Sequence, residues 1–186
     1  MKKNRIARIL AASTLLTLSV AATSFAAVGD KEIDLNLGLA TESASGSGTG
    51  WGFSVGGGHE LLAVPAVKGS TLQLRGDIGY NSWKKDPVTV TRVPVSGGGR
   101  LYVPVEAVKN LRAYGEGSFE LSFDKSEQDF GGLSGKVSES KIRFGLSPAA
   151  GVEFAVTPQI SVGAALKYHI IASGYLNASV GVGCKF

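Results

Sequence analysis

The sequence predicts an all-β fold, namely an eight-stranded antiparallel up-and-down transmembrane β-barrel. Three observations support this prediction: residues 176–186 alternate strictly between apolar and polar or small side chains, similar alternation recurs along the chain, and the N-terminus has the composition of an export signal. Alternation with a period of two is typical of a β-strand with one apolar face. In a membrane barrel, the apolar face meets lipid and the polar face fills the lumen.

Residues 1–26 are predicted to form a cleaved signal peptide, which leaves residues 27–186 as one barrel domain. Four basic residues precede an apolar stretch over 9–22, and Ser24-Phe25-Ala26 has the small-x-small pattern of a cleavage site. A single membrane anchor is the alternative, but the apolar stretch is shorter than the roughly 20 residues that a spanning helix needs. The remaining chain has a suitable length for eight strands in one domain.

The charge of the mature chain argues against nucleic-acid binding. The full sequence has 19 Lys and Arg against 15 Asp and Glu, but four of the basic residues and none of the acidic ones lie in the predicted signal peptide. The mature chain therefore carries 15 of each, so the basic balance belongs to the export signal. The one cysteine, Cys184, lies on the apolar face of the last predicted strand and leaves no partner for an intramolecular disulfide.

The first four strands are predicted at 31–40, from Trp51 onward, at 72–81 and at 88–103. Each of them alternates apolar residues with polar residues or glycine. Gly56-Gly57-Gly58 predicts a bulge or a sharp bend in the second strand.

The fourth strand has an irregular pattern. Val88 and Val90 are out of phase with Val93 and Val95, which predicts either a bulge near Arg92 or an extension beyond the bilayer. Pro94 is unusual within a central strand because proline cannot donate a ladder hydrogen bond.

The last four strands are predicted at 111–123, 141–154, 160–169 and 176–186. The longest loop is predicted over 124–140, which is polar and rich in Gly and Ser, and Thr157-Pro158-Gln159 is predicted to be a tight turn. An even number of strands places both termini at one end. No internal repeat is evident beyond this hairpin rhythm.

A soluble periplasmic sandwich or a lipocalin-like barrel would also alternate, but with its apolar face inward. The charge on the polar face favours the membrane barrel, because such residues can pair in a narrow lumen. We predict a lumen charge network of Arg75, Asp77, Arg112, Glu116, Glu120, Arg143, Glu153 and Lys167. Aromatic residues near the ends of the apolar face predict interface girdles. They are Trp51, Tyr80, Phe123, Phe144 and Tyr168 near the loop end, with Phe154 and Phe186 near the other end.

The chain resembles the small OmpA/OmpX-type eight-stranded barrels, a family of outer-membrane β-barrel domains. The resemblance lies in residues 92–95, 99–104, 111–117 and 180–186. It implies a location in the bacterial outer membrane and contact with outer-membrane lipid and lipopolysaccharide. It also implies recognition by the barrel-assembly machinery, for which the terminal aromatic Phe186 is the expected assembly signal.

A lipid A-modifying hydrolase and a narrow channel are the alternative functions. A hydrolase needs Ser and His within hydrogen-bond reach. The resembled deacylases carry His-x-Ser on one strand, whereas this chain reads His169-Ile170-Ile171-Ala172-Ser173. His169 shares the phase of Lys167 and is interpreted as a lumen histidine. Eight strands leave little free bore for a channel, so the lumen charges are interpreted as structural filling.

The sequence predicts no cofactor and no metal site. Two distant histidines and one cysteine give no zinc-ligand spacing, and Asp124, Glu127 and Asp129 do not match a calcium-binding EF-hand loop. We interpret the chain as a non-enzymatic outer-membrane barrel with a structural or surface-interaction role through its external loops, chiefly 124–140. Lys84, Lys85 and Lys125 are predicted to contact lipopolysaccharide phosphates near the external rim.

Overall fold

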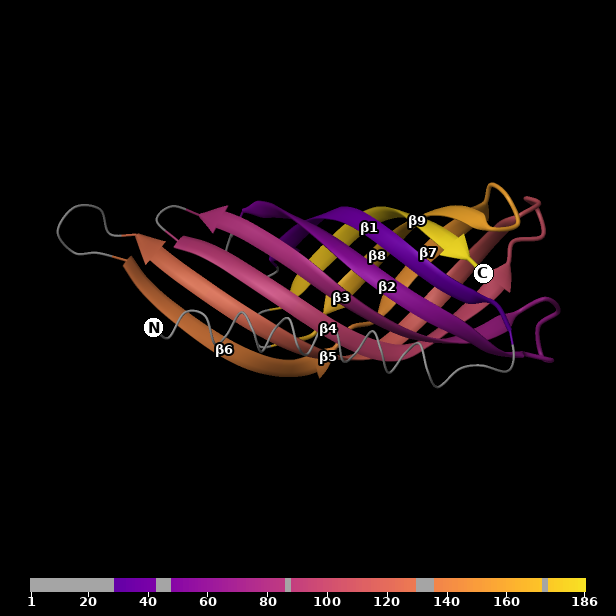
Figure 1. Cartoon of the computed structure of the whole chain (residues 1–186), viewed down its shortest axis with the longest axis horizontal. Helices are drawn as coiled ribbons and strands as arrows, with labels where there is room; N and C mark the ends of the chain where they lie inside the picture. The colour runs from indigo at the N-terminus through magenta and orange to yellow at the C-terminus, as the bar shows by residue number, and fades with distance from the viewer. Residues whose placement is uncertain (1–28, 43–47, 86–87, 130–135, 172–173) are drawn as a thin grey trace.

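The computed structural model, which describes residues 29–42, 48–85, 88–129, 136–171 and 174–186, is a closed antiparallel β-barrel (Figure 1). The predicted signal peptide and its cleavage site lie outside the described residues. The strands are β1 Lys31–Glu42, β2 Thr49–Ala63, β3 Thr71–Lys85, β4 Val88–Pro104, β5 Leu111–Asp129, β6 Lys136–Leu146, β7 Ala149–Ala155, β8 Ile160–His169 and β9 Tyr175–Lys185.

Although nine strand segments are described, they fill eight positions in the barrel. Each segment pairs with its sequence neighbours, and β1 closes the sheet by pairing with both β2 and β9. The exception is that β6 and β7 both pair with β5, in one continuous register that runs from Phe119↔Leu146 to Glu116↔Ala149. Pro148 lies between the two segments and cannot donate to the ladder. The predicted eight-stranded up-and-down barrel is therefore confirmed, with one strand interrupted by proline.

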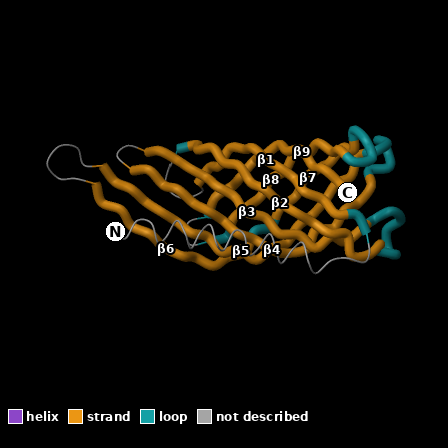
Figure 2. Tube along the Cα trace, in the orientation of Figure 1, coloured by secondary structure: helices purple, strands orange, loops and turns teal. Residues whose placement is uncertain are grey.

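The two ends of the barrel differ in their connections. The turns between β2 and β3, between β4 and β5, and between β7 and β8 lie at the same end as the C-terminus (Figures 1 and 2). We call this the turn end and the opposite one the loop end. In the predicted Thr157 turn, the Thr157 hydroxyl oxygen accepts hydrogen bonds from the backbone N–H groups of Gln159 and Ile160, at 3.2 and 2.9 Å. Such a local bond fixes a tight turn.

Two of these turns repeat one sequence motif, which the sequence analysis missed. Residues 64–69 read Val-Pro-Ala-Val-Lys-Gly and residues 105–110 read Val-Glu-Ala-Val-Lys-Asn. The last residue of each motif has a positive φ, 78° at Gly69 and 68° at Asn110. Glycine and asparagine are the residues that adopt this conformation most readily. The turn end therefore contains a short internal repeat beyond the hairpin rhythm.

The glycine triplet in β2 does not interrupt the strand pairing, so the predicted bulge is absent there. Residues 56–58 pair in unbroken register with both β1 and β3, and the irregularity in the β2–β3 pairing lies between Glu60 and Leu62. Gly56 faces the lumen, where a Cβ atom would lie 2.3 Å from Nη2 of Arg75. The missing side chain makes room for a large lumen residue.

The predicted bulge near Arg92 is also absent. β4 pairs with β5 in one register from Val88↔Gln128 to Pro104↔Arg112. Val90 has the same inward phase as Arg92 and packs against a buried apolar cluster that includes Trp83 and Tyr175. Trp83 lies in β3, beyond residue 81, where the sequence predicted that this strand ends. Pro94 is accommodated because the β3–β4 ladder is interrupted between Ile78↔Val95 and Asn81↔Arg92.

The predicted loop over 124–140 is mostly a β-hairpin. β5 and β6 pair as far as Asp129↔Lys136, and β4, β5 and β6 extend beyond the ends of β8 and β9 at the loop end (Figure 1). Beyond the bridge Leu146↔Ile170, β5 is the only strand that pairs with β6 among the residues that the structure describes. We call the described parts of this hairpin beyond the pair Phe123↔Ile142, residues 124–129 and 136–141, the hairpin extension. Polar composition alone suggested a loop because both faces of a sheet outside the membrane are polar.

The inward and outward faces of the barrel have opposite polarity. Most of the buried residues are polar or charged, whereas many large apolar side chains are exposed. Phe119, Phe144 and Val180, for example, have exposed fractions of 77%, 82% and 65%. This arrangement is typical of a barrel surrounded by lipid. Among the described residues, no helix is long and apolar enough to cross a membrane.

Two neighbouring glycines in β4 test the lumen-filling role of glycine. A Cβ atom on the inward Gly98 would lie 2.1 Å from the carbonyl oxygen of Gly117, whereas the nearest atom to a Cβ on the outward Gly97 is 3.9 Å away. We expect Gly98→Val to destabilise the barrel by about 1–3 kcal/mol through overpacking. The matched Gly97→Val should change stability by less than about 0.5 kcal/mol. Urea unfolding of the refolded barrel measures both, and equal midpoints would contradict this explanation.

Candidate functional site

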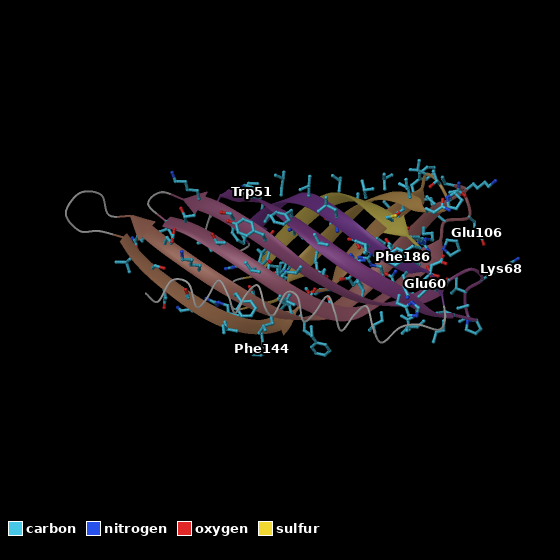
Figure 3. The ribbon with its side chains drawn as sticks, viewed as in Figure 1. Trp51, Glu60, Lys68, Glu106, Phe144 and Phe186 are labelled. Carbon is cyan, nitrogen blue, oxygen red and sulfur yellow. The ribbon has the colours of Figure 1, made fainter. Side chains whose placement is uncertain are left out.

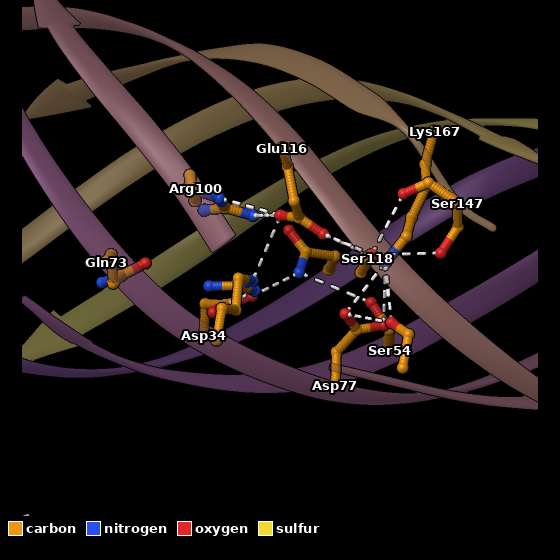
Figure 4. A network of polar contacts seen from close by, with 12 residues as sticks. Asp34, Ser54, Gln73, Asp77, Arg100, Glu116, Ser118, Ser147 and Lys167 are labelled. Atoms are coloured by element: carbon orange, nitrogen blue, oxygen red, sulfur yellow. Dashed lines mark hydrogen bonds and ion pairs between the residues drawn. The ribbon is translucent and has the colours of Figure 1, made fainter. Parts of the chain in front are cut away.

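The lumen is filled by a polar network to which strands around the whole barrel contribute. Because side chains alternate across a strand, every second residue points inward and those of facing strands meet near the axis. Figure 4 shows the central part of this network, in which Glu116 of β5 lies close to Arg100 of β4 and Lys167 of β8. These groups are far apart in sequence and are brought together by closure of the sheet.

Glu116 has the largest set of charged partners in the central layer. Its Oε2 atom accepts hydrogen bonds from Nε and Nη2 of Arg100, at 2.9 and 2.7 Å. The same oxygen lies 3.5 Å from Nε of Arg75, and Oε1 lies 3.3 Å from Nζ of Lys167. One carboxylate therefore compensates three cations, and its side chain is only 2% exposed.

Two further carboxylates complete this layer. Nζ of Lys167 donates to both carboxylate oxygens of Asp77, at 3.1 and 2.9 Å, and the Ser96 hydroxyl donates to Asp77 at 2.7 Å. Asp34 lies 2.5 Å from Nη2 of Arg75. Ion pairs in such a buried layer are favourable only when hydrogen bonds satisfy both partners.

A second layer lies toward the turn end. Glu153 accepts hydrogen bonds from Nη2 of Arg112 and from the Tyr102 hydroxyl, at 2.7 and 2.8 Å. The Arg112 guanidinium lies 4.0 Å from the centre of the Tyr102 ring, and its Nη1 donates to Glu60 at 3.1 Å. The aromatic ring thus supports the arginine from one side while the two carboxylates hold its ends.

A third layer lies toward the loop end. Nδ1 of His169 lies 2.5 Å from Oε2 of Glu120, and the His169 ring stacks on Tyr175 with their centres 3.9 Å apart. The guanidinium of Arg92 lies 5.1 Å from the centre of the Tyr175 ring. Arg92 and Arg143 both contact Asp124, at 3.3 and 2.8 Å.

The structure separates the predicted network residues into these three layers. Arg75, Asp77, Glu116 and Lys167 meet in the centre, Arg112 and Glu153 pair toward the turn end, and Glu120 and Arg143 lie toward the loop end. Glu120 contacts His169, whereas Arg143 contacts Asp124.

Sequence reasoning missed Arg92, Arg100 and Tyr102. All three lie on even-numbered positions of β4, whose phase was unclear from the sequence. The signal that could have identified them is the unbroken alternation from Arg92 to Tyr102. Once a bulge is excluded, this alternation places the side chains of Arg92, Arg100 and Tyr102 on the inward face.

A small cavity remains among these side chains. It measures about 70 Å³ and is lined on one side by charged residues of the central layer and on the other by small residues of β8 and β9. Nη1 of Arg75 is buried and has no hydrogen-bond partner among the described residues. A polar cavity of this size can hold buried water. The described residues contain no group of three or more His, Cys, Asp and Glu side chains that could hold a metal ion.

The predicted interface aromatics lie on the outward face. Figure 3 shows Trp51 and Phe144, and the ring centre of Tyr80 lies 5.4 Å from that of Trp51. Beyond this level, the outward residues toward the loop end become polar: Thr49 follows Trp51, Ser82 follows Tyr80, Lys125 follows Phe123, and Ser140 follows Phe144 and Ile142. Tyr168 is 38% exposed on β8. This change from apolar to polar outward residues, which we call the polarity boundary, marks the limit of the apolar band toward the loop end.

Phe186 lies at the opposite end and takes part in closing the barrel. Its backbone N–H donates to the carbonyl oxygen of Lys31 at 2.9 Å, and the Lys31 N–H donates back at 3.1 Å. The Phe186 side chain is 70% exposed on the outside of the barrel.

Removing the central carboxylate should leave buried cations without compensation. We expect Glu116→Gln to lower the free energy of unfolding by about 3–5 kcal/mol. Lys125→Gln is the control, because it breaks an exposed pair with Glu127 and should cost less than about 1 kcal/mol. Urea unfolding in lipid vesicles compares the two variants. Similar losses in both would show that the network contributes no more than a surface ion pair.

Solved structures of outer-membrane proteins are similar in fold. Ail, the attachment invasion locus protein of Yersinia pestis, has 16% identity and a TM-score of 0.60, covering 86% of this chain and 100% of that one. Ail in complex with the heparin analogue sucrose octasulfate gives 14% identity and a TM-score of 0.58, with the same coverage.

Two further solved structures of other proteins have the same fold. Neisserial surface protein A has 19% identity and a TM-score of 0.60, covering 84% and 96%. The outer membrane enzyme PagL has 13% identity and a TM-score of 0.50, covering 81% and 98%. At these identities, the likeness shows the fold alone. No curated protein matches the sequence.

The sequence profile of the outer membrane protein beta-barrel domain matches residues 9–186, which is almost the whole chain. The match agrees with the closed barrel, its lipid-exposed apolar face and its charged lumen. The chain therefore belongs to the outer membrane protein β-barrel domain family and is located in the bacterial outer membrane.

Proposed function

We propose that the chain is a non-enzymatic outer-membrane barrel that acts in surface interactions through its hairpin extension. The observation that carries this proposal is the continuation of β5 and β6 beyond the polarity boundary as a paired sheet rather than a loop. A preformed sheet binds a partner at a lower entropic cost than a flexible loop. The lumen network serves in this proposal as the rigid support of the extension.

The exposed edge of β6 supports an interaction role. The backbone N–H of Leu146 donates to Ile170, away from β5. Because orientation alternates along a strand, Ser140 and Ser138 also direct their N–H and C=O groups away from β5. β6 has no second strand partner there among the described residues. Such an edge is a template for an added strand.

We also propose that lipopolysaccharide contacts the outward face near the polarity boundary. Lys84 of β3 and Lys125 of β5 lie on this face, on either side of Thr89 and Thr91 of β4. Both lysines are exposed and can approach lipid phosphates, with an effect reduced by salt. The backbone of Lys85 ends β3, but its side chain lies outside the described part of the structure. Phe186 remains the proposed signal for the barrel-assembly machinery.

A lipid A-modifying hydrolase is the second candidate. The contact between His169 and Glu120 supports it, because a carboxylate can orient a catalytic histidine. The Ser122 hydroxyl, which lies on the same strand as Glu120, donates instead to Asp124 at 2.6 Å. Ser173, the serine closest to His169 in sequence, lies outside the described residues. We therefore favour the non-enzymatic role.

Shortening the hairpin extension tests the surface role. We expect replacement of residues 126–139 by Asn-Gly to leave the barrel folded, since the remaining β5–β6 pairs and the closing β1–β9 ladder are retained. Bacteria carrying the shortened chain should adhere to a heparin-coated surface no better than bacteria without the chain.

Vancomycin sensitivity and the heat-dependent gel shift are the controls for envelope integrity and folding. Adherence equal to that of the full chain would contradict a surface role of the extension, whereas increased vancomycin sensitivity would favour a structural role in the envelope.

The enzymatic alternative is tested directly on its substrate. We expect the mass of lipid A to be unchanged after lipopolysaccharide is incubated with the refolded mature chain, as measured by mass spectrometry. Loss of an acyl chain that disappears in His169→Ala would establish the hydrolase instead. Conductance steps in a planar bilayer would support the channel.

A further inference from the structure

The lipid-facing wall contains an apolar hollow where the sixth strand position is interrupted. It has a volume of about 310 Å³ and lies beside Pro148, between β6 and β7. Its lining comes from three neighbouring strand positions: Gly117, Ser118 and Phe119 of β5, Leu146 and Pro148, and Ile170 after β8. Phe119, Leu146 and Ile170 belong to the outward, exposed face of the barrel.

The hollow results from the residues that face each other across β5, the interrupted sixth strand position and the segment after β8. Gly117 is opposite Pro148 in the β5 register, and Phe119 is opposite Leu146, which pairs in turn with Ile170. Gly117 has no side chain to fill the surface, and a Cβ atom there would meet no atom of the described residues within 4 Å. The larger side chains of Phe119, Leu146 and Ile170 border the hollow on the side nearer the loop end.

The distance from the polarity boundary to the hollow matches the thickness of one membrane leaflet. Lys125, at the polarity boundary, lies six residues from Phe119 along the same face of β5. At about 3.3 Å per residue and a strand tilt of about 40°, this separation is about 15 Å along the membrane normal. A hydrocarbon core of about 30 Å places the hollow near the ends of the outer-leaflet chains.

We propose that this hollow binds an acyl chain of lipopolysaccharide whose phosphate groups lie near Lys125 and Lys84. The inference rests on the lipopolysaccharide contact proposed above and specifies the part of the wall that receives the lipid chain. The apolar lining selects hydrocarbon, and the lysines above it select an anionic headgroup. A lipid with a phosphate-bearing headgroup in the external leaflet satisfies both conditions.

Two outward glycines provide a matched test. Gly117→Leu fills the hollow with a side chain for which there is open space. Gly57→Leu is the control, because Gly57 is also outward and uncrowded, with its nearest atom 3.6 Å from a Cβ, but lies on β2 away from the hollow. Lys125→Gln tests the headgroup contact separately. All variants are refolded as the mature chain and checked by the heat-dependent gel shift.

Native mass spectrometry then counts lipid bound to each folded variant during titration with purified lipopolysaccharide or with phosphatidylglycerol. We expect Gly117→Leu to weaken lipopolysaccharide binding at least tenfold, Gly57→Leu to change it less than twofold, and phosphatidylglycerol to bind more weakly than lipopolysaccharide.

Equal binding by Gly117→Leu and the unchanged chain would overturn the acyl-chain site. If Lys125→Gln alone then weakens binding, the headgroup contact stands without the hollow. Equal weakening by both leucine variants would overturn the specificity of the hollow. Phosphatidylglycerol binding as tight as that of lipopolysaccharide would overturn the assignment of the lipid.

Discussion

In a membrane, every backbone N–H and C=O group needs a partner within the protein, and this requirement governs how the sheet of the barrel closes. The chain meets it by pairing β1 with β9, so that the first strand and the last strand close the sheet. The reciprocal bonds between Lys31 and Phe186 complete the closure at the turn end. The interruption at Pro148 is tolerated because the register continues on both sides of it.

Closure at eight strands creates an interior that side chains must fill, and here the filling is charged. Glu116 shows how such an interior is stabilised, since it compensates cations from three other strands. Inward glycines such as Gly56 provide the space that arginine side chains occupy. The outward glycine Gly117 has the opposite consequence, because it leaves a hollow in the wall rather than room in the lumen. The same residue type thus has a different effect on each face.

The need for a protein partner at every backbone N–H and C=O group ends at the membrane surface, and the structure changes there. Outward residues switch from Phe123 to Lys125 on β5, and beyond this point β5 is the one strand that pairs with β6 in the described part of the chain. Water can satisfy an exposed strand edge, whereas lipid cannot. The hairpin extension therefore presents backbone groups that the barrel wall cannot expose, and this difference underlies the surface role that we propose.

Local alternation with a period of two was enough to predict the fold class, the number of strand positions and the face on which most charged residues lie. Residues 176–186 and 111–123 illustrate this, since their alternation is uninterrupted. Three features could not be predicted in this way: the inward phase of Arg92 and Arg100, the hairpin in place of the predicted loop, and the contact of His169 with Glu120. These features depend on register and closure, which bring together residues distant in sequence. Local alternation specifies the face of a side chain but not its partner.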